Sequence, residues 1–183
     1  MKSIFGLPVL ALATFFLSLT PFQETKAPDK AAMQKSEQAV RDWFERWNAL
    51  DGTDKTADHL LELYRPDATH QTSPSEKQMG AVVYEGRDQI KKMIQDFAAA
   101  NNEIAFHFQA ATAEEKSSDM LHFAEGPWGG YSVAFQYVGA YTLKKDKTRW
   151  MYPGSAFFQI QDGKIRHVRM YMSREEIMRV YNR

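Results

Sequence analysis

Residues 155–172, with the sequence SAFFQIQDGKIRHVRMYM, carry the strongest fold signal in the chain. Apolar and polar residues alternate on both sides of the dipeptide Asp162-Gly163, which is typical of strands with one buried face. Asp-Gly between two such runs favours a two-residue turn, because both turn positions need positive φ angles. The stretch therefore predicts an antiparallel β-hairpin.

Further strand-like segments precede this hairpin. Residues 82–86 form a short apolar run, VVYEG, and residues 103–112, EIAFHFQAAT, alternate in the same way as the hairpin. Residues 129–146, GGYSVAFQYVGAYTLKKD, place a large apolar side chain at every second position over most of their length. The second half of the chain therefore predicts several meandering antiparallel strands.

The segments before these strands show helical periodicity. Between residues 32 and 50, apolar side chains recur at the spacing i, i+3, i+4 and i+7 of a helix with one buried face. A shorter helix is expected before Pro66, and a third over residues 86–102. Helices followed by strands predict an α+β fold, in which a curved antiparallel sheet wraps round the N-terminal helices.

Composition excludes several classes of partner and chemistry. The 183 residues are enough for one domain with a sizeable core. Lys+Arg and Asp+Glu both count 23, so the formal net charge is +0. Proteins that bind nucleic acid or anionic membranes typically carry an excess of positive charge, which this composition does not have. The sequence contains no cysteine, which excludes disulfides, thiol catalysis and thiolate metal sites.

The N-terminus has the layout of a secretory signal. Lys2 precedes an apolar run from residue 4 to residue 19, and Pro21 with polar residues follows it. We expect a signal peptide over residues 1–23, cut between residues 20 and 27, then a polar linker over residues 24–33 and one domain over residues 34–183. The protein is thus expected to be exported to the periplasm or secreted. If the run is not cut, it anchors the domain to the membrane.

Three segments in this order resemble the SnoaL-like family of the NTF2-like superfamily: LYRPDAT at residues 63–69, YEGRDQI at 84–90 and DGKI at 162–165. The resemblance covers about residues 33–183. It implies a cone-shaped α+β barrel with a pocket between sheet and helices, often a dimer through the sheet. It does not imply one activity, because members include isomerases, cyclases, dehydratases, epoxide hydrolases and proteins without a known reaction.

The resemblance also implies that relatives which abstract a proton from carbon carry acids at two places. The matching positions here hold hydroxyl residues, Thr72 or Ser73 at the first and Ser173 at the second. A hydroxyl without an adjacent base is a poor general base near neutral pH. Ser173 and Glu176 instead form a Ser-x-x-Glu pattern, which predicts a capping box at the start of a last helix. The isomerase and cyclase mechanisms are therefore not expected.

Histidines are the remaining candidates for acid–base chemistry. His70 lies in the strand expected to enter the cavity and is either a general base or a satisfied polar residue. His122 is a second candidate base, which Glu125 would assist. His167 belongs either to the site or to a network with Arg169 on the sheet face. The histidine spacing matches no metal motif, so neither a metal ion nor another cofactor is expected.

Aromatic side chains are the second signal for a pocket. They either line a cavity for a small apolar molecule or fill the cone as an ordinary core. The candidate ligand-binding residues are Trp43, Trp47, Tyr64, Phe106, Phe135 and Tyr171.

The sequence thus leads to one main hypothesis and two alternatives. The main hypothesis is an exported SnoaL-like domain that binds a small apolar molecule in the cone pocket without catalysis. The first alternative is a lyase, isomerase or hydrolase that uses His70 or His122 with tyrosine hydrogen-bond donors. The second is an interaction module that forms a homodimer through the outer sheet face, which is expected to carry His107 and Gln109. We expect no nucleic-acid partner and no membrane contact beyond the N-terminal signal.

Overall fold

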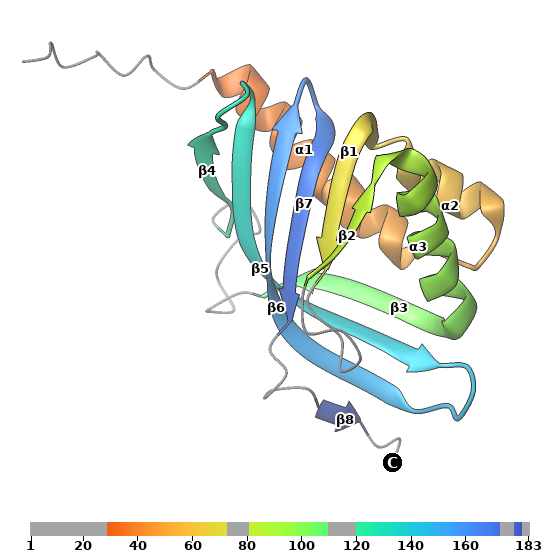
Figure 1. Ribbon diagram of the computed structural model, residues 1–183. Helices are drawn as coiled ribbons and strands as arrows, with labels where there is room; N and C mark the ends of the chain where they lie inside the picture. The colour runs from red at the N-terminus through yellow and green to blue at the C-terminus, as the bar shows by residue number, and fades with distance from the viewer. Residues whose placement is uncertain (1–28, 73–80, 110–119, 173–177, 181–183) are drawn as a thin grey trace, which may run out of the picture.

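The computed structural model of the protein describes residues 29–72, 81–109 and 120–172, and the backbone of residues 178–180. The expected signal peptide, Ser73 and Ser173 lie outside these residues. The described part of the chain consists of an N-terminal helical layer and an eight-stranded sheet (Figure 1).

The helices are α1 (Lys30–Asn48), α2 (Asp54–Leu61) and α3 (Gly86–Ala100). Helix α1 begins where the carboxylate of Asp29 accepts hydrogen bonds from the backbone N–H groups of Ala31 and Ala32, at 3.0 and 3.2 Å. All three helices lie on one side of the sheet in Figure 1. In the described part of the chain, no helix is both long and apolar enough to cross a membrane.

The sheet has the strand order β2-β1-β7-β6-β5-β3, with β4 paired to β5 and β8 paired to β6. Its strands are β1 (Tyr64–Thr72), β2 (Val82–Glu85), β3 (Asn101–Phe108), β4 (His122–Glu125), β5 (Tyr131–Leu143), β6 (Arg149–Gln161), β7 (Lys164–Met172) and β8 (Met178–Val180).

The predicted α+β class with a curved sheet against the N-terminal helices is confirmed, with two differences in detail. Strands β1 and β7 pair in parallel, so the sheet is mixed rather than purely antiparallel. They are distant in sequence, and no short turn forces them to run in opposite directions. The sheet also stays open, because the edge strands β2 and β3 do not pair with each other.

The predicted hairpin is confirmed. Strands β6 and β7 pair in antiparallel fashion, and the turn residues Asp162 and Gly163 have φ angles of 53° and 72°, as a two-residue turn requires.

The predicted C-terminal helix is wrong at residues 178–180, which form strand β8. Strand β7 pairs with β6 only from Gly154 onward, which leaves the start of β6 with one unpaired edge. Strand β8 pairs with that edge from Met151 to Arg149. An open strand edge offers backbone hydrogen bonds that the local capping pattern cannot outweigh.

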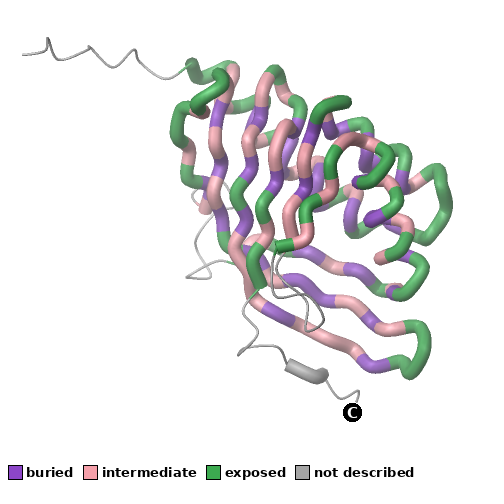
Figure 2. Tube along the Cα trace, viewed as in Figure 1, coloured by how far each residue is buried: buried purple, intermediate pink, exposed green. Residues whose placement is uncertain are grey.

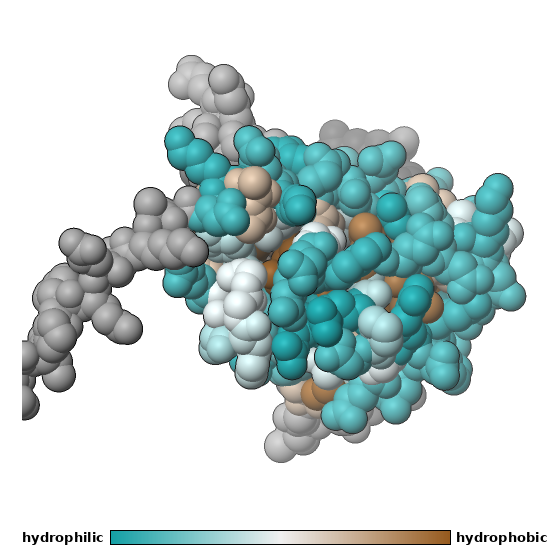
Figure 3. All heavy atoms as spheres, turned by 90° about the horizontal axis from the view of Figure 1, so that it is seen from above, coloured by the Kyte–Doolittle hydropathy of each residue, from teal (hydrophilic) through white to brown (hydrophobic). Residues whose placement is uncertain are grey.

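The core lies between the helices and the sheet. On β5, the side chains of Tyr131, Val133, Phe135 and Tyr137 are buried, and the residues between them are more exposed, an alternation that Figure 2 shows along the strands. The face that carries these buried side chains is the helix-covered face. The opposite face, which carries Ser132, Ala134 and Gln136 of β5, is called the open face here. Seen from above, the molecular surface is mostly hydrophilic, with small apolar areas between polar side chains (Figure 3).

Candidate functional site

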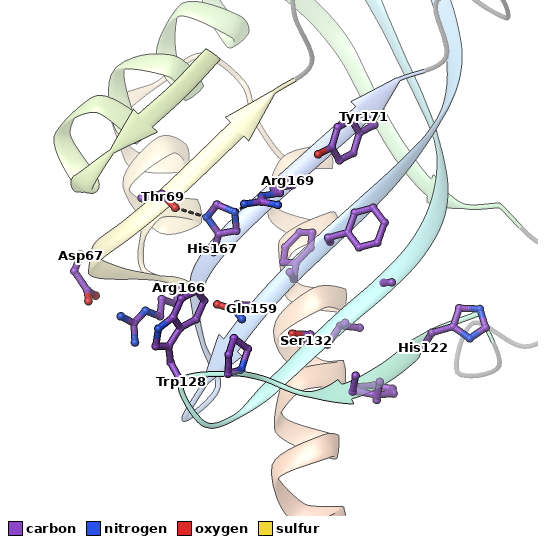
Figure 4. A pocket seen from close by; sticks show the side chains of 17 residues that line it. Asp67, Thr69, His122, Trp128, Ser132, Gln159, Arg166, His167, Arg169 and Tyr171 are labelled. Atoms are coloured by element: carbon purple, nitrogen blue, oxygen red, sulfur yellow. Dashed lines mark hydrogen bonds between the residues drawn. The ribbon is translucent and has the colours of Figure 1, made fainter. Parts of the chain in front are cut away.

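A groove of about 800 Å³ lies on the open face of the sheet (Figure 4). This volume is in the range of small-molecule sites in proteins. Strands β1, β7, β6, β5 and β4 and the turn after β4 supply its walls. The lining residues are Asp67, Thr69, His122, Phe123, Ala124, Pro127, Trp128, Ser132, Val133, Ala134, Phe157, Phe158, Gln159, Arg166, His167, Arg169 and Tyr171.

A polar row crosses the floor of the groove. Its members come from segments far apart in sequence, and strand pairing alone brings them together. Each is the register partner of the next across β1, β7, β6 and β5: Thr69, His167, Gln159 and Ser132. The side-chain oxygen of Gln159 is buried and receives no hydrogen bond from the residues that the structure describes.

An aromatic and cationic row lies beside the polar row. Arg169 of β7 is the register partner of Phe157 of β6, and Phe157 is the partner of Ala134 of β5. Tyr171 contacts Phe157 edge-on, with ring centroids 6.0 Å apart. Arg169 is therefore opposite Phe157, one member of an exposed pair of aromatic side chains.

A β-bulge on β7 gives the groove its second arginine. Gln159 pairs with His167, but the next partners on β6 and β7 are Ile160 and Ile165. Arg166 is therefore the extra residue on β7, and both Arg166 and His167 line the groove while Ile165 is fully buried. Bulges commonly redirect a side chain in this way.

A hydrogen-bond chain fixes Arg169 and His167. The Nε–H group of Arg169 donates to Nε2 of His167 at 2.8 Å, so the ring proton of a neutral His167 is on Nδ1. The Nδ1–H group donates a hydrogen bond to Oγ1 of Thr69 (Figure 4). Burial, and then the positive charge of Arg169, hold the pKa of His167 below its usual value. His167 is therefore neutral at pH 7.

The other charged groups at the groove are Arg166 and Asp67. The guanidinium carbon of Arg166 lies 5.1 Å from the ring centroid of Trp128, a cation–π arrangement. Asp67 accepts a hydrogen bond from Nε of Arg65 at 2.9 Å, which lowers the pKa of Asp67. Among the described residues, no carboxylate forms an ion pair with Arg166 or Arg169.

Comparison with known proteins supports the resemblance seen in the sequence. Residues 40–168 match the family model described as a SnoaL-like domain. The chain belongs to the SnoaL-like family. A comparison with curated protein sequences found no significant match.

Solved structures similar to this SnoaL-like protein have the NTF2-like fold. An NTF2-like protein of unknown function from Exiguobacterium sp. 255-15 is 15% identical, with a TM-score of 0.54 over 74% of this chain and 98% of that one. A putative scytalone dehydratase from Novosphingobium aromaticivorans DSM 12444 is 13% identical, with a TM-score of 0.59 over 84% and 90%. SalBIII, an epoxide hydrolase/cyclase-like enzyme, is 23% identical, with a TM-score of 0.56 over 79% and 95%. At these identities the likeness concerns the fold alone.

In this SnoaL-like protein, the candidate base His70 lies in the core with 1% of its surface exposed. Nε1–H of Trp43 donates to the Tyr64 hydroxyl at 2.8 Å, and that hydroxyl donates to Nδ1 of His70 at 3.0 Å. Burial, with a smaller contribution from His167, lowers the pKa of His70 to about 3. This environment suits a structural role, and catalysis by His70 stays a prediction.

The structure separates the six candidate ligand-binding residues. Five of them are buried between the helices and the helix-covered face: Trp43 and Trp47 of α1, Tyr64 of β1, Phe106 of β3 and Phe135 of β5. The Trp43 ring lies 5.6 Å from that of Trp47 and 5.7 Å from that of Phe106, centroid to centroid, so aromatic rings pack closely in the described part of the cone. Tyr171 lies on the open face and lines the groove instead.

The expected pairing of His122 with Glu125 is not formed among the described residues. His122 lines the groove at the end opposite Thr69 (Figure 4), and its register partner is Ala134. Glu125 pairs with Tyr131, whose side chain is buried on the helix-covered face. Side chains three residues apart on a strand point to opposite faces, so the carboxylate cannot assist the imidazole.

Several groove residues were not singled out in the sequence. Alternation along β6 was a usable signal for the open face, because it groups Phe157 with Gln159. Trp128 lies in a turn and Arg166 at a bulge, and periodicity indicates neither position. Among the described residues, no group of three or more His, Asp or Glu side chains could hold a metal ion.

Proposed function

We propose that this SnoaL-like protein binds a small planar, largely apolar molecule in the groove on the open face and does not convert it. The observation that carries the proposal is the set of three exposed aromatic side chains at the groove. Trp128, Phe157 and Tyr171 are 59%, 48% and 43% exposed. Large aromatic side chains gathered at a cavity are typical of ligand sites.

The hydrogen bonds in the groove favour binding over catalysis. Both ring nitrogens of His167 are already hydrogen bonded, one to Thr69 and one to Arg169. His122 is exposed and has no carboxylate partner among the described residues. A general base needs a free lone pair and a neighbouring group that stabilises its protonated form. His167 has no free lone pair, and His122 has no such carboxylate among the described residues.

The proposal is tested with 2-naphthamide, a planar uncharged probe. We expect the purified protein to bind it, measured by calorimetry and by quenching of tryptophan fluorescence. Replacement of Phe157 by Ser should weaken binding about tenfold, because a stacked ring contributes on the order of 1 kcal/mol.

Val83→Ala is the matched control, because Val83 is an exposed apolar residue on β2 that does not line the groove. This variant should bind 2-naphthamide as the unchanged protein does. Equal binding by the Phe157 variant would contradict the proposal.

A second candidate function is self-association through the open face. The specific observation is that β2, β6 and β7 each carry an exposed large apolar side chain: Val83, Phe157 and Tyr171. Gln109, expected at a dimer interface, lines a smaller cavity of about 440 Å³ next to Tyr171. A second copy of the chain would cover this surface and compete with a ligand for it.

A further inference from the structure

The two arginines of the groove leave an unbalanced positive charge on its wall. Arg166 and Arg169 face a single carboxylate, that of Asp67, among the lining residues. Asp67 is already hydrogen bonded to Arg65. His167, which lies next to Arg169, is neutral and therefore neither adds to this positive charge nor offsets it.

Arg169 is held in a defined orientation. Its Nε–H group is used by His167, and His167 is in turn fixed by Thr69. The two terminal nitrogens of the guanidinium group form no hydrogen bond with the described residues. They are the donors that a carboxylate binds side by side, in the geometry that distinguishes Arg from Lys.

From this arrangement we infer that the groove prefers planar aromatic molecules that carry a carboxylate, with Arg169 binding the carboxylate. This inference rests on the proposed function, because it names the ligand class of the same groove. The aromatic part of the ligand would lie against Phe157, the register partner of Arg169, and against Tyr171. Arg166, covered by Trp128, adds a second positive charge near the site.

The spacing of the parts supports a ligand that joins an aromatic ring directly to its acid group. Arg169 and Phe157 are opposite each other on neighbouring strands, so their Cβ atoms are roughly 5 Å apart. A ring that packs on Phe157 therefore places a directly attached carboxylate beside Arg169. A long flexible spacer between ring and acid would not match this geometry.

The test compares 2-naphthoate with 2-naphthamide, which has the same ring and no charge. At pH 7 the purified protein should bind the acid roughly tenfold to hundredfold more tightly than the amide, because charge-assisted hydrogen bonds replace neutral ones. The preference should fall as salt is added, since the site is partly exposed.

Arg169→Gln should abolish the preference by lowering the affinity for the acid to that for the amide. Arg169→Lys should retain part of it, because charge stays but the two-donor geometry is lost. Lys55→Gln is the control, since it removes one positive charge from an exposed position on α2. It should leave both affinities unchanged, and circular dichroism checks that all variants fold.

Thr69 is inferred to be a positioning residue that acts through His167. Thr69→Val removes the hydroxyl that accepts from Nδ1 of His167. The expected result is a smaller ratio of acid to amide affinity, with the amide affinity itself unchanged. A general loss of structure would lower both affinities together, so the ratio separates the two effects.

The outcomes separate this inference from the proposed function. If both probes bind with equal affinity and Arg169→Gln has no effect, the carboxylate preference is wrong while the ligand groove stands. If neither probe binds the unchanged protein, both proposals fail.

Discussion

At the scale of single residues, the buried chain from Trp43 through Tyr64 to His70 is the most constrained polar feature of the core. It joins α1 to β1, and each member is almost fully buried. A buried hydroxyl or imidazole without a partner would cost on the order of 1–3 kcal/mol, so the three groups stabilise one another's burial. These hydrogen bonds explain how a histidine can be buried on the helix-covered face.

The lowered pKa of His70 predicts that acid destabilises the fold. In the unfolded chain His70 binds a proton below about pH 6.5, whereas the folded chain does not accept it until about pH 3. Stability is therefore lost as the pH falls through this window. When the pH is lowered from 7 to 5, the free energy of unfolding should fall by about 2 kcal/mol because of His70. Urea denaturation at the two pH values measures this difference.

His70→Gln should remove this loss, since glutamine does not titrate and its carbonyl can still accept from Tyr64. His59→Gln, at an exposed histidine of α2, is the control and should keep the wild-type difference between the two pH values. If His70→Gln and the wild type lose equal stability, the imidazole is not buried as described.

At the scale of elements, β6 is the strand on which the sheet depends. It pairs with β5 from Arg149 to Ile160, with β7 along one part of its other edge and with β8 along another. Gly154 lies at the point where β7 pairing begins. A Cβ atom there would lie 2.5 Å from Cζ of Tyr137 and 2.5 Å from the backbone oxygen of Tyr171. Only glycine leaves room for both.

Gly154→Ala should therefore destabilise the protein by about 1–3 kcal/mol, the usual cost of overpacking. Chemical denaturation measures the effect. Ser155→Ala, at the next position but on the open face, should change stability by no more than about 0.5 kcal/mol. A Gly154→Ala variant as stable as the wild type would show that Tyr137 does not pack against β6.

At the scale of the whole molecule, the two faces of the sheet differ in packing and exposure. The helix-covered face is packed with aromatic rings in its described part, whereas the open face carries the groove and exposed aromatic side chains. Exposed aromatic side chains gathered in this way are typical of a ligand site or of an interface with another chain. The oligomeric state decides between these two uses.

If the open face is a dimer interface, the protein should sediment at twice the mass of one domain in analytical ultracentrifugation. The double variant Phe157→Ser, Tyr171→Ser should then sediment as a monomer, because it removes the apolar surface that the two copies would share. Ala99→Ser, on the exposed side of α3, is the control and should not change the mass. A wild-type monomer would contradict self-association and leave the groove open to a ligand.

Much of the fold was predictable because it follows from local patterns. The spacing of Trp43, Phe44 and Trp47 indicated α1, and alternation with Asp162-Gly163 indicated the β6–β7 hairpin. The prediction failed where pairing between distant segments decided the outcome. Strand β8 replaced a predicted helix at residues 178–180, and Tyr64, expected at the end of a helix, begins β1.

The sequence by itself determined the α+β class, the SnoaL-like family and the aromatic content of the core, since each depends on residue type and spacing along the chain. Only the tertiary structure decided where a candidate site lies. Register between distant strands placed Thr69, His167 and Gln159 in one row, and a single bulge turned Arg166 toward the same face. Register and bulges depend on partners elsewhere in the chain, so local periodicity does not reveal them.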